Sequence, residues 1–332
     1  MARIQTAPYV HTQRTSLSRG YEWLAALCPI LVWSIYMFGA RVVTLCLIGG
    51  GLSLGLDYIV QRFVFKMKRG ARLDMMSLVY GILAVFSMPV AVALYLPIIS
   101  AILVVIAKNA RIIRAHRLFN PFVFSAAVLG ICFKSQMTCF TRPFAYFSPF
   151  TVSLDPKLVE GYRVISPLQF MADGSVYEDG VMAQLYGFAS GCIGEIAVAA
   201  MILSLIWLCI RREADWRGPV AMLAPILLLS LVFPSSDAES NYYAYSVILS
   251  GAIFFLSVFA TNESCTVPQT KNGRYIFGAA CGIIIFLLRK AGGGFEWGYA
   301  VVLVLNAVSP FIEMLTKPKL ATKKNGKAKV KK

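Results

Sequence analysis

Residues 42–60 read VVTLCLIGGGLSLGLDYIV, and stretches of this kind decide the class of the fold. As an α-helix this stretch would be about 28 Å long, close to the roughly 30 Å of hydrocarbon in a bilayer. Asp57 is its only acidic or basic residue. The stretch therefore predicts a helix that crosses a membrane.

The rest of the chain has the same character. Of its 332 residues, 58% are hydrophobic and 14% are charged, whereas soluble domains carry about 25% charged residues. A soluble core could not hide so much apolar surface, but lipid can cover it. We therefore predict an all-α polytopic protein of the bacterial inner membrane with about ten transmembrane helices and no soluble catalytic domain. The first 22 residues are polar and lack an apolar signal region, so the first helix is expected to remain.

The apolar stretches divide into two sets of five. The predicted helices are Trp23–Phe38, Val42–Val60, Asp74–Met88, Ala93–Ala107, Phe122–Thr138, Met182–Ile210, Pro219–Phe233, Tyr243–Ala260, Tyr275–Leu288 and Trp297–Leu315. The predicted organisation is a cytoplasmic N-terminus and first helix set (1–138), an outer loop (139–181), a second set (182–315) and a polybasic tail (316–332). The long loop suggests a functional or disordered segment.

Basic residues fix the expected orientation. The net charge is +16, and most of it falls in alternate connections, at residues 62–72, 108–117, 211–217 and 271–274, and in the tail. This bias predicts that both termini lie in the cytoplasm and that the tail touches anionic lipid. Charge spread between apolar segments does not favour nucleic-acid binding. Arg289 and Lys290 are exceptions, since the same rule places them outside.

A weak internal repeat accompanies this pattern. Residues 80–89 read YGILAVFSMP and residues 250–259 read SGAIFFLSVF. Five helices in each half would give the halves opposite orientations, as in inverted-repeat membrane folds with broken helices near the midplane. Chance similarity between apolar segments is the alternative.

Few residues suggest chemistry. The sequence has no phosphate-binding glycine loop, no GxSxG motif and no zinc signature, and its eight cysteines form no CxxC pair, so no metal site is predicted. Glu195, in Gly191–Glu195, is the main candidate because ionisable groups in apolar segments are usually functional. It could serve a cation or proton path, or pair with a neighbouring helix. Asp57 and Glu313 are expected at the cytoplasmic interface.

Asn120 and Pro121 suggest a helix start, with asparagine as the N-cap and proline in the first turn. The alternative interpretation is a broken-helix end that offers its dipole to an anionic group such as a flavin phosphate.

Several motifs, in order along the chain, resemble one family. They are residues 7–15 (APYVHTQRT), 117–121 (RLFNP), 190–195 (SGCIGE), 250–252 (SGA), 272–278 (NGRYIFG) and 306–310 (NAVSP). They are similar to motifs in D subunits of the Rnf electron-transport complex, which are related to the B subunit of sodium-pumping NADH:quinone reductase. The resemblance implies a ten-helix fold similar to urea transporters. It also implies partner subunits in a redox pump that couples electron flow between ferredoxin and NAD to sodium or proton movement.

The same resemblance implies FMN, joined through its phosphate to a threonine in a Ser-Gly-Ala-Thr-Pro-Leu motif on the outer side. Here residues 163–168 read RVISPL, so Ser166 takes the acceptor position and bulky Val164 and Ile165 replace small residues. The expected cofactor residues are Ser166 as candidate attachment site, with Asn120, Pro167, Gly191 and Gly251. Riboflavin is a second candidate cofactor. Residues 261–263 also depart from the family, reading Thr-Asn-Glu in place of Thr-Asp-Pro.

Three functions remain open from the sequence. The first is a non-autonomous subunit of a redox-driven ion translocase that carries or contacts a flavin near its outer face. The second is a small-solute transporter or channel, since an inverted repeat fits that class equally well. The third is a flavin-free structural subunit of the same complex, because the attachment motif is altered.

Overall fold

The computed structural model describes residues 16–64, 73–110, 117–150, 164, 166–167, 180–234, 240–294 and 296–317. Within these residues the regular elements are helices, and no β-strand occurs. Several predictions concern residues outside this part: the motif at 7–15, most of the predicted outer loop with Ile165, and the tail after residue 317.

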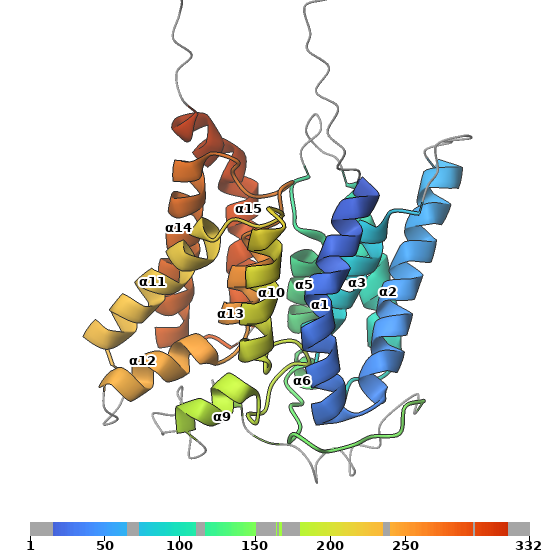
Figure 1. Ribbon diagram of the computed structural model, residues 1–332, viewed down its shortest axis with the longest axis horizontal. Coiled ribbons are helices and arrows are strands. Elements are labelled where there is room, and N and C mark those ends of the chain that lie inside the picture. The colour runs from blue at the N-terminus through green and yellow to red at the C-terminus, as the bar shows by residue number, and fades with distance from the viewer. Residues whose placement is uncertain are drawn as a thin grey trace, which may run out of the picture.

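The first helix group runs up and down the molecule (Figure 1). It comprises α1 (Ser16–Phe38), α2 (Arg41–Ile59) with a π-helical turn η1 (Val60–Val64), α3 (Met75–Phe86), α4 (Tyr95–Asn109), α5 (Pro121–Cys132) and the short α6 (Lys134–Met137). Asp74 begins α3, where its side chain accepts a hydrogen bond from the Met76 amide at 3.2 Å.

The second helix group lies beside the first. It comprises α9 (Gly180–Tyr186), α10 (Val198–Ile210), α11 (Arg217–Val232), α12 (Ser240–Leu249), α13 (Ile253–Phe255) with a π-helical turn η2 (Leu256–Ala260), α14 (Lys271–Lys290) and α15 (Glu296–Thr316). Helix α1 begins and α15 ends at the same end of the molecule, the top of Figure 1. We name this the terminal end, and the opposite end, where α6 and α9 lie, the loop end.

The two groups have corresponding internal packing. Helix α2 packs on α3 and α4, and α11 packs on α12 and α14. Two pairs join the groups, because α1 packs on α10 and α5 packs on α15. Buried aromatic rings fill the space between them, and the Phe122 and Phe255 ring centroids are 5.8 Å apart. The hydrophobic core therefore spans both groups.

Glycines allow α2 and α3 to approach closely. A Cβ atom at Gly81 of α3 would lie 2.6 Å from the Gly49 carbonyl oxygen of α2 and 2.8 Å from the Gly50 Cα. Small residues at helix contacts are typical of membrane proteins, where packing rather than water drives association.

The outward surface is apolar, as expected for a protein in lipid. Leu47, Leu228, Leu287 and Val304 are each more than half exposed. Four helical stretches of the described chain are long and apolar enough to cross a membrane: Leu17–Phe38, Arg41–Val64, Lys271–Lys290 and Glu296–Thr316. The pair Tyr242–Leu249 and Ile253–Ala260, bent by 61°, makes a fifth if it is one broken span. The prediction of a helical membrane protein is therefore confirmed, while α3, α4, α5, α10 and α11 are shorter apolar helices.

Two predicted helices are broken in the structure. The predicted Met182–Ile210 helix divides into α9 and α10, separated by residues 187–197, and the predicted Tyr243–Ala260 helix bends at residues 250–252. Continuous helices were wrong here because Gly187 and Gly251 adopt positive φ angles of 87° and 61°. Apolar composition alone cannot reveal such breaks. The predicted Phe122–Thr138 helix likewise ends at Cys132 before the separate α6.

Candidate functional site

The bend between α12 and α13 is held by an arginine from another helix. Arg289, at the end of α14, donates to the carbonyl oxygens of Val247 at 3.0 Å and of Ser250 at 3.2 Å. Carbonyl groups at a helix end lack intrahelical partners, so they need donors of this kind. This contact explains why a basic residue lies at the loop end of the molecule, where the bias of basic residues toward the cytoplasm did not predict one.

An equivalent contact occurs in the first group. Arg41, fully buried at the start of α2, donates to the carbonyl oxygens of Val90 at 2.9 Å and of Val92 at 2.8 Å. These carbonyls belong to the irregular segment after α3. Each helix group thus has an arginine that satisfies the backbone of an interrupted segment.

The segment 187–197 between α9 and α10 lies against the first helix group. The Ile193 amide donates to the Met88 carbonyl at 2.9 Å, and the Gly194 amide donates to the Phe86 carbonyl at 2.8 Å. A Cβ atom at Gly194 would lie 2.5 Å from the Phe86 Cβ, so glycine permits this approach. These hydrogen bonds fix the backbone that carries Glu195.

The segment 187–197 and the α12–α13 bend together line a cavity of about 20 Å³, which we name the loop-end cavity. Its lining residues are Phe140, Ser166, Pro167, Gln184, Ala189, Ser190, Gly191, Glu195, Ile196, Leu249, Ser250 and Gly251. This volume holds about one water molecule, which needs roughly 10–15 Å³. The cavity is therefore a small, largely enclosed site with several polar side chains.

Glu195 provides the formal charge among the described residues of this lining. Its side chain is 4% exposed, and the Tyr299 hydroxyl of α15 donates to its Oε1 at 2.9 Å. Cys192 also hydrogen-bonds Glu195, and the guanidinium of Arg289 contributes a favourable charge interaction. A carboxylate buried among these donors can hold a proton or a cation, which few other buried groups can do.

The structure brings five of the six predicted site residues together. Ser166, Pro167, Gly191, Glu195 and Gly251 all line the loop-end cavity, although they come from separate segments of the chain. Sequence reasoning did not identify Gln184, Ser190 or Ser250 as site residues. Ser190 and Ser250 begin two of the family motifs, at residues 190–195 and 250–252, whereas Gln184 lies in a stretch without a distinguishing pattern.

Asn120 is not among the residues that line the cavity. It is the N-cap residue of α5, with Pro121 in the first turn, as predicted, although its side chain makes no capping hydrogen bond. Asn120 is fully buried, and neither polar atom of its amide has a partner in the described part of the chain. Asn306 of α15 is in the same condition.

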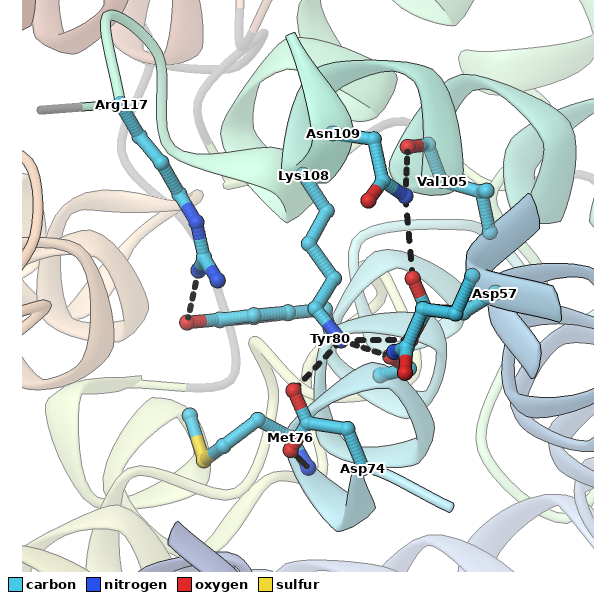
Figure 2. Close-up of polar contacts among 10 residues, drawn as sticks. Asp57, Asp74, Met76, Tyr80, Val105, Lys108, Asn109 and Arg117 are labelled. Carbon is cyan, nitrogen blue, oxygen red and sulfur yellow. Dashed lines mark hydrogen bonds and ion pairs between the residues drawn. The ribbon is translucent and has the colours of Figure 1, made fainter. Parts of the chain in front are cut away.

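A second polar site lies near the terminal end, among α2, α3 and α4 (Figure 2). We name it the Asp57–Lys108 cluster; its members are Asp57, Asp74, Ser77, Lys108 and Asn109. The Lys108 ammonium donates to Asp57 Oδ2 at 2.8 Å and to Asp74 Oδ2 at 2.6 Å. It also donates to the Ser77 hydroxyl, and the Asn109 amide donates to Asp57 Oδ1 at 2.9 Å.

Asp57 is 1% exposed and Lys108 is 4% exposed. Asp57 is thus buried among the helices near the terminal end, where a lysine from another helix neutralises it; its place at the cytoplasmic interface stays a prediction. One feature of the sequence points to this ion pair. Asp74 begins one predicted helix and Lys108 directly follows the next, so both are expected on the same side of the membrane. Glu313, by contrast, makes an i,i+4 ion pair with the more exposed Lys317 at 3.4 Å.

A third group of polar residues lies beside this cluster. Arg117, before α5, donates to the Tyr80 hydroxyl at 3.2 Å, and its guanidinium lies 5.8 Å from the centroid of that ring. Glu263, the residue that departs from the family pattern, is buried nearby, and its Oε2 accepts no hydrogen bond from described residues. This arrangement joins the two helix groups near the terminal end.

Comparison with known proteins covers nearly the whole chain. A model of the NQR2, RnfD, RnfE family matches residues 3–322. Similar proteins include the D subunit of the ion-translocating oxidoreductase complex of Halorhodospira halophila, 25% identical over 96% of this chain and 95% of that protein. The D subunit of the proton-translocating ferredoxin:NAD(+) oxidoreductase complex of Clostridium ljungdahlii is 23% identical, over 95% of this chain and 94% of that protein. The Na(+)-translocating counterpart of Acetobacterium woodii is 23% identical over 96% and 94%.

Proposed function

The chain belongs to the NQR2, RnfD, RnfE family, and from this membership we propose that it is the D subunit of a multi-subunit, ion-translocating oxidoreductase complex. Two of the similar proteins are subunits of ferredoxin:NAD(+) oxidoreductase complexes, one named as proton-translocating and the other as Na(+)-translocating. Because the match spans almost the full length of this chain and of its relative, the resemblance is not limited to one shared segment. The chain therefore acts as a non-autonomous membrane subunit.

The proposed topology is ten membrane passages in two inverted sets, in the bacterial inner membrane, with the terminal end in the cytoplasm. The corresponding packing of α2 on α3 and α4, and of α11 on α12 and α14, supports the repeat. Basic residues at the terminal end, including Arg117 and Arg211, support the orientation. Contact between the tail and anionic lipid stays a prediction.

The observation that carries the ion-translocating part of the proposal is the buried Glu195 in the loop-end cavity. Buried carboxylates within membrane bundles are costly and mark ion or proton pathways. Glu195 is reached from both helix groups, because its own segment hydrogen-bonds to the end of α3 while Tyr299 donates from α15. We therefore assign Glu195 to the ion path of the complex.

The flavin proposal needs a test of fit. Ser166 supplies the hydroxyl that a phosphoester requires, but its side chain is only 6% exposed and the cavity beside it has room for about one water. A flavin ring needs a far larger site, and a phosphate would lie beside the Glu195 carboxylate. The described residues thus do not fit FMN inside this cavity, and we derive no step through a flavin. FMN at Ser166, and riboflavin elsewhere, stay predictions from the resemblance.

One experiment tests the assignment of the complex. The chain carrying an affinity tag is expressed from its own chromosome and purified in mild detergent. We expect membrane partner subunits to co-purify, with ferredoxin-dependent reduction of NAD(+) in the preparation. We expect inverted vesicles from a Glu195→Gln strain to retain electron transfer while ion movement falls. Two results together would refute the proposal. The tagged chain would purify alone, and vesicles from a strain that lacks its gene would keep ferredoxin-driven ion movement.

The same preparation tests the flavin. In-gel flavin fluorescence that comigrates with this chain and disappears in Ser166→Ala would support covalent FMN. A colourless chain that is still needed for assembly of the complex would support the flavin-free structural role.

A further inference from the structure

The loop-end cavity has an unusual concentration of buried polar groups for its size. Ser166, Gln184, Ser190, Glu195 and Ser250 all line it, and each is at most 6% exposed. The Oε1 atom of Gln184 accepts no hydrogen bond from the described residues, although the residue is only 2% exposed. An acceptor without a donor in a water-sized, polar cavity indicates a hydrogen-bonded occupant.

We propose that a single water in this cavity delivers protons between the loop end of the protein and Glu195. The proposal rests on the assignment of Glu195 to the ion path, and it names the ion, its carrier and its route. Gln184 accepts a hydrogen bond from the water.

The lining connects Glu195 with the loop end. Phe140 and Ser166 come from the segments beyond α5 and α6, and they form part of the lining together with Glu195. The Glu195 segment is itself fixed to the first helix group by its backbone hydrogen bonds to Phe86 and Met88. We therefore assign the loop-end side as the side with which Glu195 exchanges protons.

The charges around Glu195 favour a proton over a sodium ion. Its own segment contributes the Cys192 thiol, α15 contributes the Tyr299 hydroxyl, and α14 contributes the positive Arg289. Tyr243 of α12 interacts in turn with Arg289. Among the described residues that line the cavity, Glu195 is the one carboxylate. A metal cation would therefore add a positive charge beside Arg289 with only one carboxylate to balance both, whereas a proton converts Glu195 into a neutral acid.

The step is simple and balanced. The cavity water passes one of its protons to a Glu195 carboxylate oxygen while it accepts another proton from the loop-end side; one O–H bond of the water breaks, one O–H bond forms at the water and one at Glu195, and a neutral water remains. In the reverse direction Glu195 returns the proton to the water. The Tyr299 hydroxyl keeps its hydrogen bond to the carboxyl group throughout, which holds the side chain toward the cavity.

Carbodiimide labelling of the purified full-length chain tests this proposal without the rest of the complex. Dicyclohexylcarbodiimide reacts with protonated carboxyl groups in apolar surroundings, and mass spectrometry of the peptide locates the adduct. We expect an adduct at Glu195 that declines as pH rises and that sodium chloride, compared with choline chloride, does not change. Glu195→Gln, which keeps an acceptor for Tyr299, should abolish it. Glu263→Gln, a buried acid outside the cavity, should leave it unchanged.

A second measurement separates access from folding. Gln184→Leu removes the cavity acceptor without touching Glu195, and we expect slower hydrogen–deuterium exchange of the infrared band of the protonated Glu195 carboxyl, with an unchanged melting temperature. If sodium at constant pH protected Glu195 from the carbodiimide, a metal ion rather than a proton would be the bound cation, and the proposal would be overturned. Absence of both the adduct and the carboxyl band from the folded chain across the pH range would also overturn it. Either failure leaves co-purification with partner subunits unaffected, so the two proposals are tested separately.

Discussion

Replacing Lys108 with methionine should destabilise the protein strongly. The substitution keeps most of the length of the side chain but removes the ammonium that bonds Asp57 at 2.8 Å and Asp74 at 2.6 Å. Asp57 is 1% exposed, so its charge would remain in the bundle without an opposite charge. Removing one partner of a buried ion pair costs about 3–5 kcal/mol. Loss of a single hydroxyl, as in Ser77→Ala, should cost only about 0.6 kcal/mol, the average for a hydrogen bond between membrane helices.

The free energy of unfolding is measured by detergent titration of the purified chain, with circular dichroism as the signal. Lys317→Met is the matched control, because Lys317 pairs with Glu313 near the surface, where an i,i+4 pair is worth about 0.3–0.5 kcal/mol. The double variant Asp57→Asn, Lys108→Met should recover much of the lost stability, since no unpaired charge remains on Asp57. A loss below about 1 kcal/mol for Lys108→Met, or no recovery in the double variant, would refute the view that these charges compensate each other.

Three further predictions follow from the structure. Arg289→Ala removes the arginine donor of the Ser250 carbonyl at the α12–α13 bend and one donor of the Val247 carbonyl, which keeps the Ser250 hydroxyl, and should cost about 1–3 kcal/mol in a denaturation assay; Lys290→Ala, which loses one exposed hydrogen bond, should cost much less. Gly81→Ala places a methyl group 2.6 Å from a backbone oxygen of α2 and should cost about 1–3 kcal/mol, while Gly51→Ala, which meets nothing within 4 Å, should be near neutral in the same assay. Cys132 is exposed at the loop end, so a membrane-impermeant maleimide should label it in intact cells whose outer membrane is permeabilised; labelling only in inverted vesicles would reverse the proposed orientation.

The sequence predicts the long apolar helices well. The predicted helix 42–60 corresponds to α2 at Arg41–Ile59, and the predicted helix 297–315 corresponds to α15 at Glu296–Thr316. These elements follow from composition, because a run of apolar residues in lipid satisfies its backbone hydrogen bonds by forming a helix. Helix α1 begins at Ser16, before its predicted start at Trp23, since a polar first turn can extend beyond the apolar region.

The breaks and long-range polar contacts were harder to predict. Gly251 signals a bend only when its φ angle is known, since glycine is also common inside membrane helices. The pairing of Asp57 with Lys108 depends on the packing of three helices, which a single sequence does not specify. The family resemblance predicted that Ser166 and Gly251 share a site, but neither the position of Glu195 in the same cavity nor the size of that cavity was predicted.

The backbone hydrogen bonds between segment 187–197 and the end of α3 limit how this protein can move. The Gly194 amide nitrogen and the Phe86 carbonyl oxygen, 2.8 Å apart, belong to opposite helix groups. A rocking motion of one group against the other would have to break these hydrogen bonds and leave the peptide groups without partners in a water-free interior during each cycle. The chain is thus suited to act as a rigid subunit of its complex, whose two helix groups do not move against each other.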